Sequence, residues 1–487
     1  MSRKERAKQA SSIRKRKQML KQVERRLLFS EVVNFVLPAG ELFSKKQFHG
    51  NIKWVPEQLA AQAMIWSWQD TKKVTDAFEK TLEICAKLGL KRIAKTYTTF
   101  MDALSEYRET IRNGLRARFQ VLAEQIGGKF FRTNKWVLIG FDGSRATAPR
   151  STANEKAFCA HNYGHSNKAK YGKKKSKGLR RKRNAAHKTE PQEPQVWITM
   201  MWHMELRLPW TWRLGPSNSS ERGHVQEMLE QEEFPEKTLF CGDAGFTGYP
   251  LWNSIKAANC DFLVRVGANV SLLSEHTDFK TIDGGIVLCW PKNRMDSGDP
   301  PLRLRLVQVQ IGKTKMWMLT SVLDERKLSL EQIVTYYKMR WLIEVEFRGL
   351  KQTIDKHKLR CRNSDRLLAE LDWSIQGMAF AELLALRAQI PKAKTVNKKY
   401  SPKDRSLANT LRVLRTYMRN LNQKVQPDAL NDDLSEAVVQ KYKNRTDKRA
   451  RYRRKNPDKK PLGDPKIRKL TSDEKKKLQA HELKNAA

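Results

Sequence analysis

The sequence predicts an α/β fold in which a mixed sheet, covered by helices, is interrupted by a small β insertion. Between residues 136 and 266, short apolar runs of strand length alternate with helical patterns. Residues 267–328 contain only short, strand-like alternations, and the regions before and after the sheet have helical periodicity. At 487 residues and 39% hydrophobic content, the chain is long enough for several domains with a sizeable core.

The N-terminal region, residues 1–127, reads as helical. From about residue 57 to residue 126 the pattern fits three or four amphipathic helices with Lys and Arg on their outer faces. Such helices suit a DNA-binding bundle. A helical cap that packs on the next domain explains them equally well.

Residues 128–266 are predicted to form the first part of the core. The expected strands and helices, in chain order, are strands 136–141, 196–205 and 210–214, helix 221–231, strand 238–241, helix 250–258 and strand 261–266. Three early strands followed by alternation are the order expected of an RNase H-like sheet.

The rest of the chain completes this fold. Residues 267–328 are predicted as the β insertion, with strands at 285–290, 302–311 and 315–320. Residues 329–390 hold the second part of the core, with one helix over 329–354 and another over 365–388. Residues 391–487 form a basic region for DNA contact or dimerisation, with helices at 405–420, 432–443 and 472–484.

The charge balance points to a polyanionic partner. The chain has a formal net charge of +43, and much of it lies in the runs 1–27, 168–188 and 441–469. The protein without these runs is still basic, which favours nucleic acid as the partner. A soluble body with disordered charged tails, or a basic protein associated with RNA or the ribosome, is the alternative.

The expected location is the cytoplasm, in a bacterial cytosol or nucleoid. The six cysteines are scattered without paired spacing, which suits a reducing compartment. No apolar run approaches the length of a membrane span, so no membrane partner is expected.

Residues 336–351, YYKMRWLIEVEFRGLK, are the most informative stretch. Their apolar residues recur with a helical period and form one stripe. Tyr337, Arg340, Glu344 and Lys351 occupy an adjacent stripe of the same helix. A solvated ion-pair face is the simple explanation, because Arg340 and Glu344 are four residues apart.

The spacing of these four residues resembles a known signature. Tyr, two residues, Arg, three residues, Glu, six residues, Lys is typical of the YREK-type insertion-sequence transposases (family four), a group of DDE transposases. The resemblance predicts two aspartates upstream. Asp142, which follows the apolar run 136–141 and precedes Gly-Ser, and Asp243, followed by Ala-Gly-Phe, are similar to the family's two Asp motifs. Each motif alone is also explained by a turn.

Three carboxylates gathered by folding would repel one another and raise one another's pKa unless cations neutralised them. Oxygen ligands suit Mg²⁺, with Mn²⁺ as the alternative ion. Two such ions can activate an attacking oxygen and stabilise a leaving one, which is the chemistry of cutting and joining phosphodiesters.

The resemblance implies a role for each site residue. It implies that Asp142, Asp243 and Glu344 are catalytic and hold the metals, and that Tyr337, Arg340 and Lys351 contact phosphates near the cleaved transposon end. In some family members a Trp of the insertion stacks on a flipped base, for which Trp290 and Trp317 are the candidates. The alternative for both is a place in the core of the insertion.

The resemblance further implies a cut-and-paste DNA transposase that cleaves transposon ends, often through a hairpin, and transfers the strand into target DNA. Its partners would be double-stranded DNA and a second copy of the chain in a synaptic complex. The sequence leaves open a domesticated or inactive transposase that only binds DNA, and an RNase H-like nuclease without strand transfer.

Overall fold

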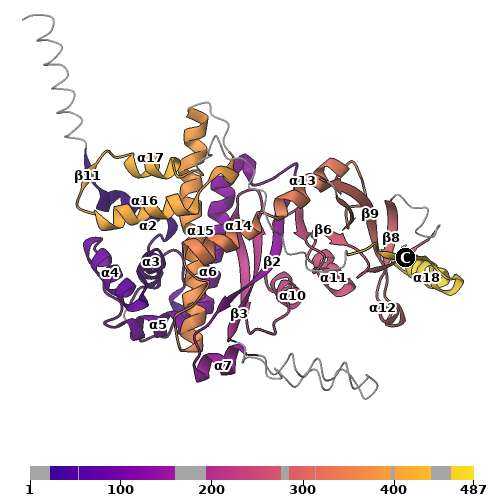
Figure 1. The fold of residues 1–487 in the computed structure, drawn as a ribbon, viewed down its shortest axis with the longest axis horizontal. Helices are drawn as coiled ribbons and strands as arrows, with labels where there is room; N and C mark the ends of the chain where they lie inside the picture. Colours follow the sequence, from indigo (N-terminus) through magenta and orange to yellow (C-terminus); the bar gives the residue numbers. More distant parts are fainter. Residues whose placement is uncertain are drawn as a thin grey trace, which may run out of the picture.

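A computed structural model describes residues 22–52, 54–159, 193–275, 284–312, 314–395, 401–439 and 462–486. The basic run 168–188 and most of the runs 1–27 and 441–469 lie outside the described residues. Figure 1 shows the N-terminal helices gathered with helices 407–419 and 429–435 at one end of the molecule. The sheet runs from them to the β insertion, beside which the C-terminal helix 472–486 lies. No helix within the described ranges combines the length and the apolar character needed to cross a membrane.

Ten strands form one mixed sheet in the order β12-β7-β8-β9-β10-β6-β5-β2-β3-β4. The strands are β2 (Val137–Thr147), β3 (Gln195–His203), β4 (Leu208–Gly215), β5 (Thr238–Gly242), β6 (Asp261–Val266), β7 (Ser271–Ser274), β8 (Gly284–Cys289), β9 (Leu302–Ile311), β10 (Thr314–Thr320) and β12 (Lys466–Lys469). The hairpin strands β2, β3 and β4 are antiparallel, whereas β5 and β6 run parallel to β2. The prediction of a mixed α/β fold is therefore confirmed.

The insertion is continuous with the core sheet. β10 pairs antiparallel with β6, with Trp317 opposite Val266, so hydrogen bonding crosses from one region to the other without a break. The strands expected at 285–290, 302–311 and 315–320 are present as β8, β9 and β10. Two further strands, β7 and β12, extend this end of the sheet, and β12 comes from near the C-terminus.

Helices cover the sheet and form a separate layer beside it. They are α2 (Arg25–Val36), α3 (Pro56–Ser67), α4 (Val74–Lys87), α5 (Tyr97–Glu106), α6 (Arg108–Gly127), α7 (Thr152–Phe158), α10 (Glu221–Gln231), α11 (Tyr249–Ala257), α12 (Lys292–Asp296), α13 (Leu330–Arg340), α14 (Ile343–Arg348), α15 (Ser364–Thr395), α16 (Leu407–Arg419), α17 (Ala429–Ser435) and α18 (Ser472–Ala486). α15 and α6 lie on one side of β3, and α10 lies on the other (Figure 1).

The N-terminal helices pack as a cap on α15. The indole nitrogen of Trp68, which follows α3, donates a hydrogen bond to the Gly377 carbonyl within α15 at 2.7 Å. A Cβ on Gly377 would overlap the Ser67 hydroxyl, so the glycine permits this close approach of α3 to α15. The short strand β1 (Val23–Glu24) also pairs with β11 (Lys424–Val425), which ties the described N-terminus to the C-terminal helices.

The single helix expected over 329–354 is wrong, because the structure divides it into three segments. α13 ends at Arg340, α14 begins at Ile343, and residues 349–353 form a π-helical turn. Between α13 and α14 the backbone bonds shift to i→i−3, as from Trp341 N to the Lys338 carbonyl and from Glu344 N to the Trp341 carbonyl. The break changes the direction in which Glu344 projects relative to Arg340.

The strand around Asp142 also differs from the prediction. An apolar run ending at Phe141 indicates a strand that stops there, but β2 continues to Thr147. Its second half pairs with β3, where Asp142 lies opposite Met200, and its last residue, Thr147, also forms a bridge with Lys358. Sequence periodicity could not show this extension, because residues 142–147 are not apolar.

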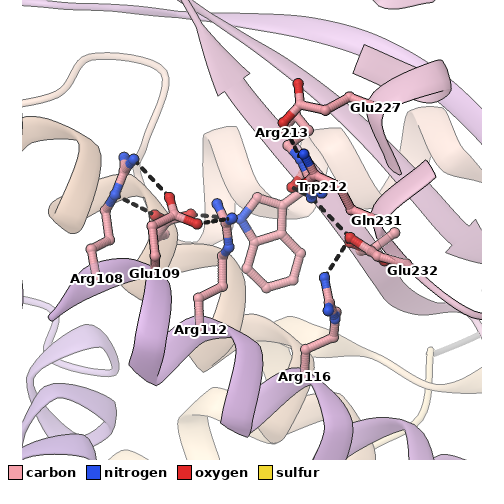
Figure 2. Close-up of polar contacts among 11 residues, drawn as sticks. Arg108, Glu109, Arg112, Arg116, Trp212, Arg213, Glu227, Gln231 and Glu232 are labelled. Atoms are coloured by element: carbon pink, nitrogen blue, oxygen red, sulfur yellow. Dashed lines mark hydrogen bonds and ion pairs between the residues drawn. The ribbon is translucent and has the colours of Figure 1, made fainter. Parts of the chain in front are cut away.

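A buried polar junction joins α6, β4 and α10 (Figure 2). Arg213 on β4 donates from Nη1 to Glu232 Oε1 at 2.9 Å and from Nη2 to Gln231 at 2.8 Å, so it holds the C-terminal end of α10. Arg116 of α6 makes a second ion pair with the same Glu232 oxygen. Nearby, the Trp212 indole nitrogen donates to Asp372 of α15 at 2.7 Å. The junction thereby fixes α10 against both the sheet and the helical cap.

We expect Glu232→Ala to lower the free energy of unfolding by about 3–5 kcal/mol, because it leaves the buried Arg213 and Arg116 without their shared carboxylate. Urea unfolding followed by circular dichroism measures the change. Glu233→Ala, at the exposed neighbouring position, is the matched control and should change the free energy by less than about 0.5 kcal/mol. Equal effects of the two substitutions would show that the junction does not hold α10.

Candidate active site

Parallel pairing of β2 with β5 places Asp142 and Asp243 side by side. The last residues in register are Gly140 and Cys241, and each aspartate stands two positions beyond them. Both side chains are held by the local backbone: Asp142 accepts a hydrogen bond from Gly143 N at 2.8 Å, and Asp243 accepts one from Gly245 N at 2.7 Å. The pairing of β2 with β5 thus brings together two residues that are 101 positions apart in the chain.

An aromatic contact beneath the two aspartates holds the strand ends together. The rings of Phe141 and Phe246 have centroids 4.4 Å apart, and both side chains are fully buried. A Cβ on Gly242 would overlap the Phe141 ring, so the glycine at the end of β5 gives that ring its place. Asp142 therefore directly follows the buried Phe141, and Asp243 directly follows the tightly packed Gly242. Because these two neighbours contact each other, the two strand ends are held together.

Glu344 reaches the same region from α14. This short helix packs against β2, and its inward carboxylate, Glu346, is buried against the guanidinium of Arg207 at 2.8 Å. Glu344, two residues earlier, is exposed. The buried Glu346–Arg207 ion pair anchors α14 and leaves Glu344 on the open side.

The pKa of Asp142 responds to the charges of the other two predicted carboxylates. Burial raises the pKa of Asp142, and the negative charges of Asp243 and Glu344 raise it further. The Gly143 backbone N–H and the Arg340 guanidinium, whose Nη1 lies 3.9 Å from Asp142 Oδ2, oppose that rise. The structure therefore brings Asp142, Asp243 and Glu344 into one electrostatic neighbourhood.

A fourth carboxylate, Glu221, was not predicted. It is the first residue of α10, and a Cβ on Gly143 would overlap its Oε1, so its side chain lies directly over Gly143. Burial raises its pKa to about 7, and the charges of Asp142 and Asp243 contribute to the rise. From the sequence, Ser220-Glu221 resembles an ordinary helix start, since Ser220 caps the helix through Gly223 N and acidic residues favour first turns.

The carboxylate cluster (Asp142, Glu221, Asp243 and Glu344) has the donor chemistry of a Mg²⁺ site. Its side-chain donors are all oxygens. Burial and the neighbouring carboxylates raise the pKa of Asp142 and of Glu221, and a bound cation would instead favour their charged forms. Among the described residues, however, no three His, Cys, Asp or Glu side chains stand ready to enclose an ion. Mg²⁺ sites that act on phosphates commonly use one or two carboxylates and complete the shell with water and substrate oxygens, so the arrangement fits such a site.

The Tyr, Arg and Lys of the signature are spread over two of the three helical segments. Arg340 is 5% exposed, its Nε has no hydrogen-bond partner in the part of the chain that the structure describes, and its Cζ lies 5.5 Å from the centre of the Tyr337 ring. Tyr337 is 2% exposed. Lys351 lies in the π-helical turn, half-buried, and burial lowers its pKa.

The two tryptophans proposed for base stacking are both in the core. Trp290 is buried and donates from its indole nitrogen to the Asp299 carbonyl at 2.8 Å. Trp317 is buried and donates to Asp464 at 2.9 Å. Their burial agrees with the alternative role, a place in the core of the insertion. Trp341, which was not singled out, is 55% exposed and lies between Arg340 and Glu344, with the Arg340 guanidinium 5.4 Å from its ring centre.

We expect the metal-free protein to lose stability as the pH rises from the ordinary glutamate value of 4.5 to about 7. In this window the unfolded chain releases the Glu221 proton, whereas the folded protein keeps it, so rising pH favours unfolding. Glu221→Gln should remove this loss and raise the melting temperature in EDTA by a few degrees above pH 7, with no gain below pH 4.5. Thermal melts across this pH range measure it, with the exposed Glu230→Gln on the same helix as the control. Parallel pH profiles for wild type and Glu221→Gln would contradict the assignment.

Comparisons with known proteins bear on the same region. Residues 141–375 match the family model described as the transposase DDE domain. A protein of Sinorhizobium fredii (strain NBRC 101917 / NGR234) named "Putative transposase y4zB" is 26% identical over 138 residues, which are 26% of this chain and 37% of that protein.

Among solved structures, the piggyBac transposase synaptic complex with hairpin DNA is similar over 88% of each chain, with a TM-score of 0.39 and 11% identity. The matched region 141–375 contains all the residues that the sequence singled out: Asp142, Asp243, Trp290, Trp317, Tyr337, Arg340, Glu344 and Lys351. Over this part of its length, the chain is therefore similar to the DDE transposases.

Proposed function

We propose that this protein is a DNA transposase that cleaves phosphodiester bonds at transposon ends and joins the freed 3′-hydroxyl to target DNA. The observation that best supports the proposal is the register of β2 and β5, which puts Asp142 and Asp243 at neighbouring strand ends within the region that matches the transposase DDE domain. The negative charge of Glu344, on α14, also raises the pKa of Asp142. Asp142 and Asp243 are 101 residues apart in the chain, so local ion pairs do not account for their closeness.

Asp142, Asp243 and Glu344 would hold Mg²⁺, with Mn²⁺ as the alternative, and Glu221 would lie beside them. When bound, the metal ions would activate an attacking oxygen and stabilise a leaving one at phosphorus. The two aspartates are suited to this task because backbone N–H groups fix their carboxylates. Glu344 is suited because the buried Glu346 anchors its helix.

Arg340 is the best-supported phosphate ligand of the signature. Among the residues that the structure describes, the Nε of its buried guanidinium has no hydrogen-bond partner, and its contact with Asp142 is long at 3.9 Å. It therefore has donors to offer a phosphate that approaches the carboxylate cluster. Tyr337, beneath it, would orient it or donate its own hydroxyl. Lys351 would add a mobile positive charge. The exposed Trp341 ring offers a surface on which a base could stack.

The narrower features of the proposal follow from the same site. The strand arrangement, with β2, β3 and β4 antiparallel and then β5 and β6 parallel to β2, supports an RNase H-like core. The unbroken Tyr337, Arg340, Glu344 and Lys351 spacing supports the YREK-type group. Double-stranded transposon ends, target DNA and a second copy of the chain would be the partners, and the net charge of +43 suits such polyanions.

Glu344→Gln should keep its affinity for DNA from the ends of its own element and lose Mg²⁺-dependent nicking by more than about 100-fold. The carboxamide preserves shape but removes the negative charge, and even residues outside the ligand shell cost 10–100-fold when changed. Nicking of supercoiled plasmid on agarose gels measures the activity. Glu331→Gln, at an exposed position on α13, is the control and should nick normally. Nicking by Glu344→Gln at the wild-type rate would remove Glu344 from the mechanism.

Arg340→Ala should weaken binding to transposon-end DNA and lower the slope of log affinity against log salt by about one, since one phosphate contact is lost. Fluorescence anisotropy at several salt concentrations gives the slope. Arg348→Ala, which changes an exposed arginine on α14, is the control and should leave the salt slope unchanged. The same slope for wild type and Arg340→Ala would show that Arg340 contacts no phosphate.

A strand-transfer assay separates the alternatives. A transposase joins cleaved 3′ ends to a target plasmid, whereas an RNase H-like nuclease stops after cleavage and a domesticated DNA-binding protein does neither. Preference for RNA over DNA in a competition at physiological salt would instead favour an RNA-associated protein.

A further inference from the structure

The C-terminal segment from Leu462 onward is built into the β insertion. β12 pairs in parallel with β7 along its whole length, from Lys466 opposite Ser271 to Lys469 opposite Ser274. Leu470 and Leu478 join a small hydrophobic cluster with Leu273, Leu288, Trp290 and Met295. The Asp464 carboxylate accepts the Trp317 indole hydrogen, and the Leu462 carbonyl accepts a hydrogen bond from Ala268 N. These contacts make the segment a structural part of the insertion.

This segment lines a groove of about 1,070 Å³ together with α11, α12 and the start of α10. The cationic groove, as we call it, carries Arg222, Lys292, Lys466 and Arg468, and no Asp or Glu is among the described residues that line it. Glu474 neutralises Arg468 through a two-bond ion pair, which leaves Arg222, Lys292 and Lys466 to set the sign of the charge. All three of these are exposed.

One end of the cationic groove adjoins the carboxylate cluster. Arg222 directly follows Glu221, and its Nη1 donates to the Thr247 carbonyl, four residues after Asp243, at 2.8 Å. Asn269, on the insertion side, donates to the Ala244 carbonyl at 2.9 Å and thereby closes the join between the Asp243 loop and the insertion. An anion that leaves the carboxylate cluster on this side meets positive charge from two sides of the groove.

We propose that the cationic groove binds the sugar-phosphate backbone of one DNA strand next to the cleavage site, and that the C-terminal strand β12 supplies its outer side through Lys466. This rests on the proposed function and assigns a site to the part of the basic C-terminal region that the structure describes. Positive charge without carboxylates, a volume of about 1,070 Å³ and the closeness of Arg222 to the carboxylate cluster favour a chain of phosphates over a single small anion.

Lysine footprinting tests the proposal on the unmodified full-length protein. Acetylation of each lysine is measured by mass spectrometry in EDTA, with and without saturating duplex DNA. Lys466 and Lys292 should lose most of their reactivity. Lys469, the next lysine on β12, does not line the groove, so it should keep its reactivity and is the internal control. Full reactivity of Lys466 and Lys292 with DNA bound would overturn the proposal. So would equal protection by pyrophosphate alone, which would identify a small-anion site.

A substitution gives an independent measurement. Each lost phosphate contact lowers the slope of log affinity against log salt by about 0.9. The affinity of Lys466→Ala for DNA should therefore fall less steeply with salt than that of wild type. The ratio of the two affinities should shrink about threefold between ~50 and ~200 mM salt. Lys469→Ala should follow the wild type, and identical salt slopes for Lys466→Ala and Lys469→Ala would contradict the assignment. Both measurements run without metal, so they do not depend on cleavage. If DNA protects Lys466 and Lys292 but the wild-type protein never nicks DNA in Mg²⁺, the proposed function is refuted and the groove assignment is not. If the wild-type protein nicks DNA but the two lysines are not protected, only the groove assignment is refuted.

Discussion

The parallel pairing of β2 and β5 is the interaction on which the candidate site depends most. Asp142 and Asp243 are 101 residues apart in the chain, and this register brings their carboxylates near each other. The pairing places like charges in a partly buried position, which by itself opposes folding. Buried aromatic packing of Phe141 against Phe246, with Gly242 allowing the approach, holds the strand ends in place against that repulsion.

The remaining carboxylates are held by buried ion pairs placed at a distance from them. α14 carries Glu344 outward because Glu346 is fixed by Arg207 on its inner side. α10 carries Glu221 at its first residue, while Arg213 and Arg116 fix Glu232 just beyond its other end (Figure 2). Buried ion pairs are weak contributors to stability, but they impose one geometry, which is what a cluster of repelling groups needs. Burial and the nearby Glu346 carboxylate raise the pKa of Glu382, which favours its neutral form and avoids a second buried negative charge there.

Local patterns in the sequence predicted most elements well. Helix 221–231 and the strands at 196–205, 210–214, 238–241 and 261–266 rest on clear periodicity between polar breaks, and each is present. The gathering of Asp142, Asp243 and Glu344 was inferred from a resemblance to a family, because no spacing within one sequence reveals contacts between residues a hundred positions apart.

The remainder could not be predicted for identifiable physical reasons. The break at Trp341 and Leu342 keeps a helical apolar period, so it looks like continuous helix. Glu221 resembles any acidic residue at a helix start, and its neighbourhood depends on Gly143 from another strand. β12 is a short, basic stretch that becomes a strand only because β7 offers it an open edge. Trp290 and Trp317 are large apolar residues, and whether they face a ligand or a core depends on packing that sequence does not record.

The central claim is that the gathered carboxylates share divalent metal ions. Calorimetric titration of Mg²⁺ into wild type, Asp142→Asn and Asp243→Asn, each with a non-cleavable DNA bound, tests it most directly. We expect saturable binding by wild type and at least about tenfold weaker binding by either variant, since each loses a charged oxygen ligand. Equal Mg²⁺ affinity in all three proteins would contradict it.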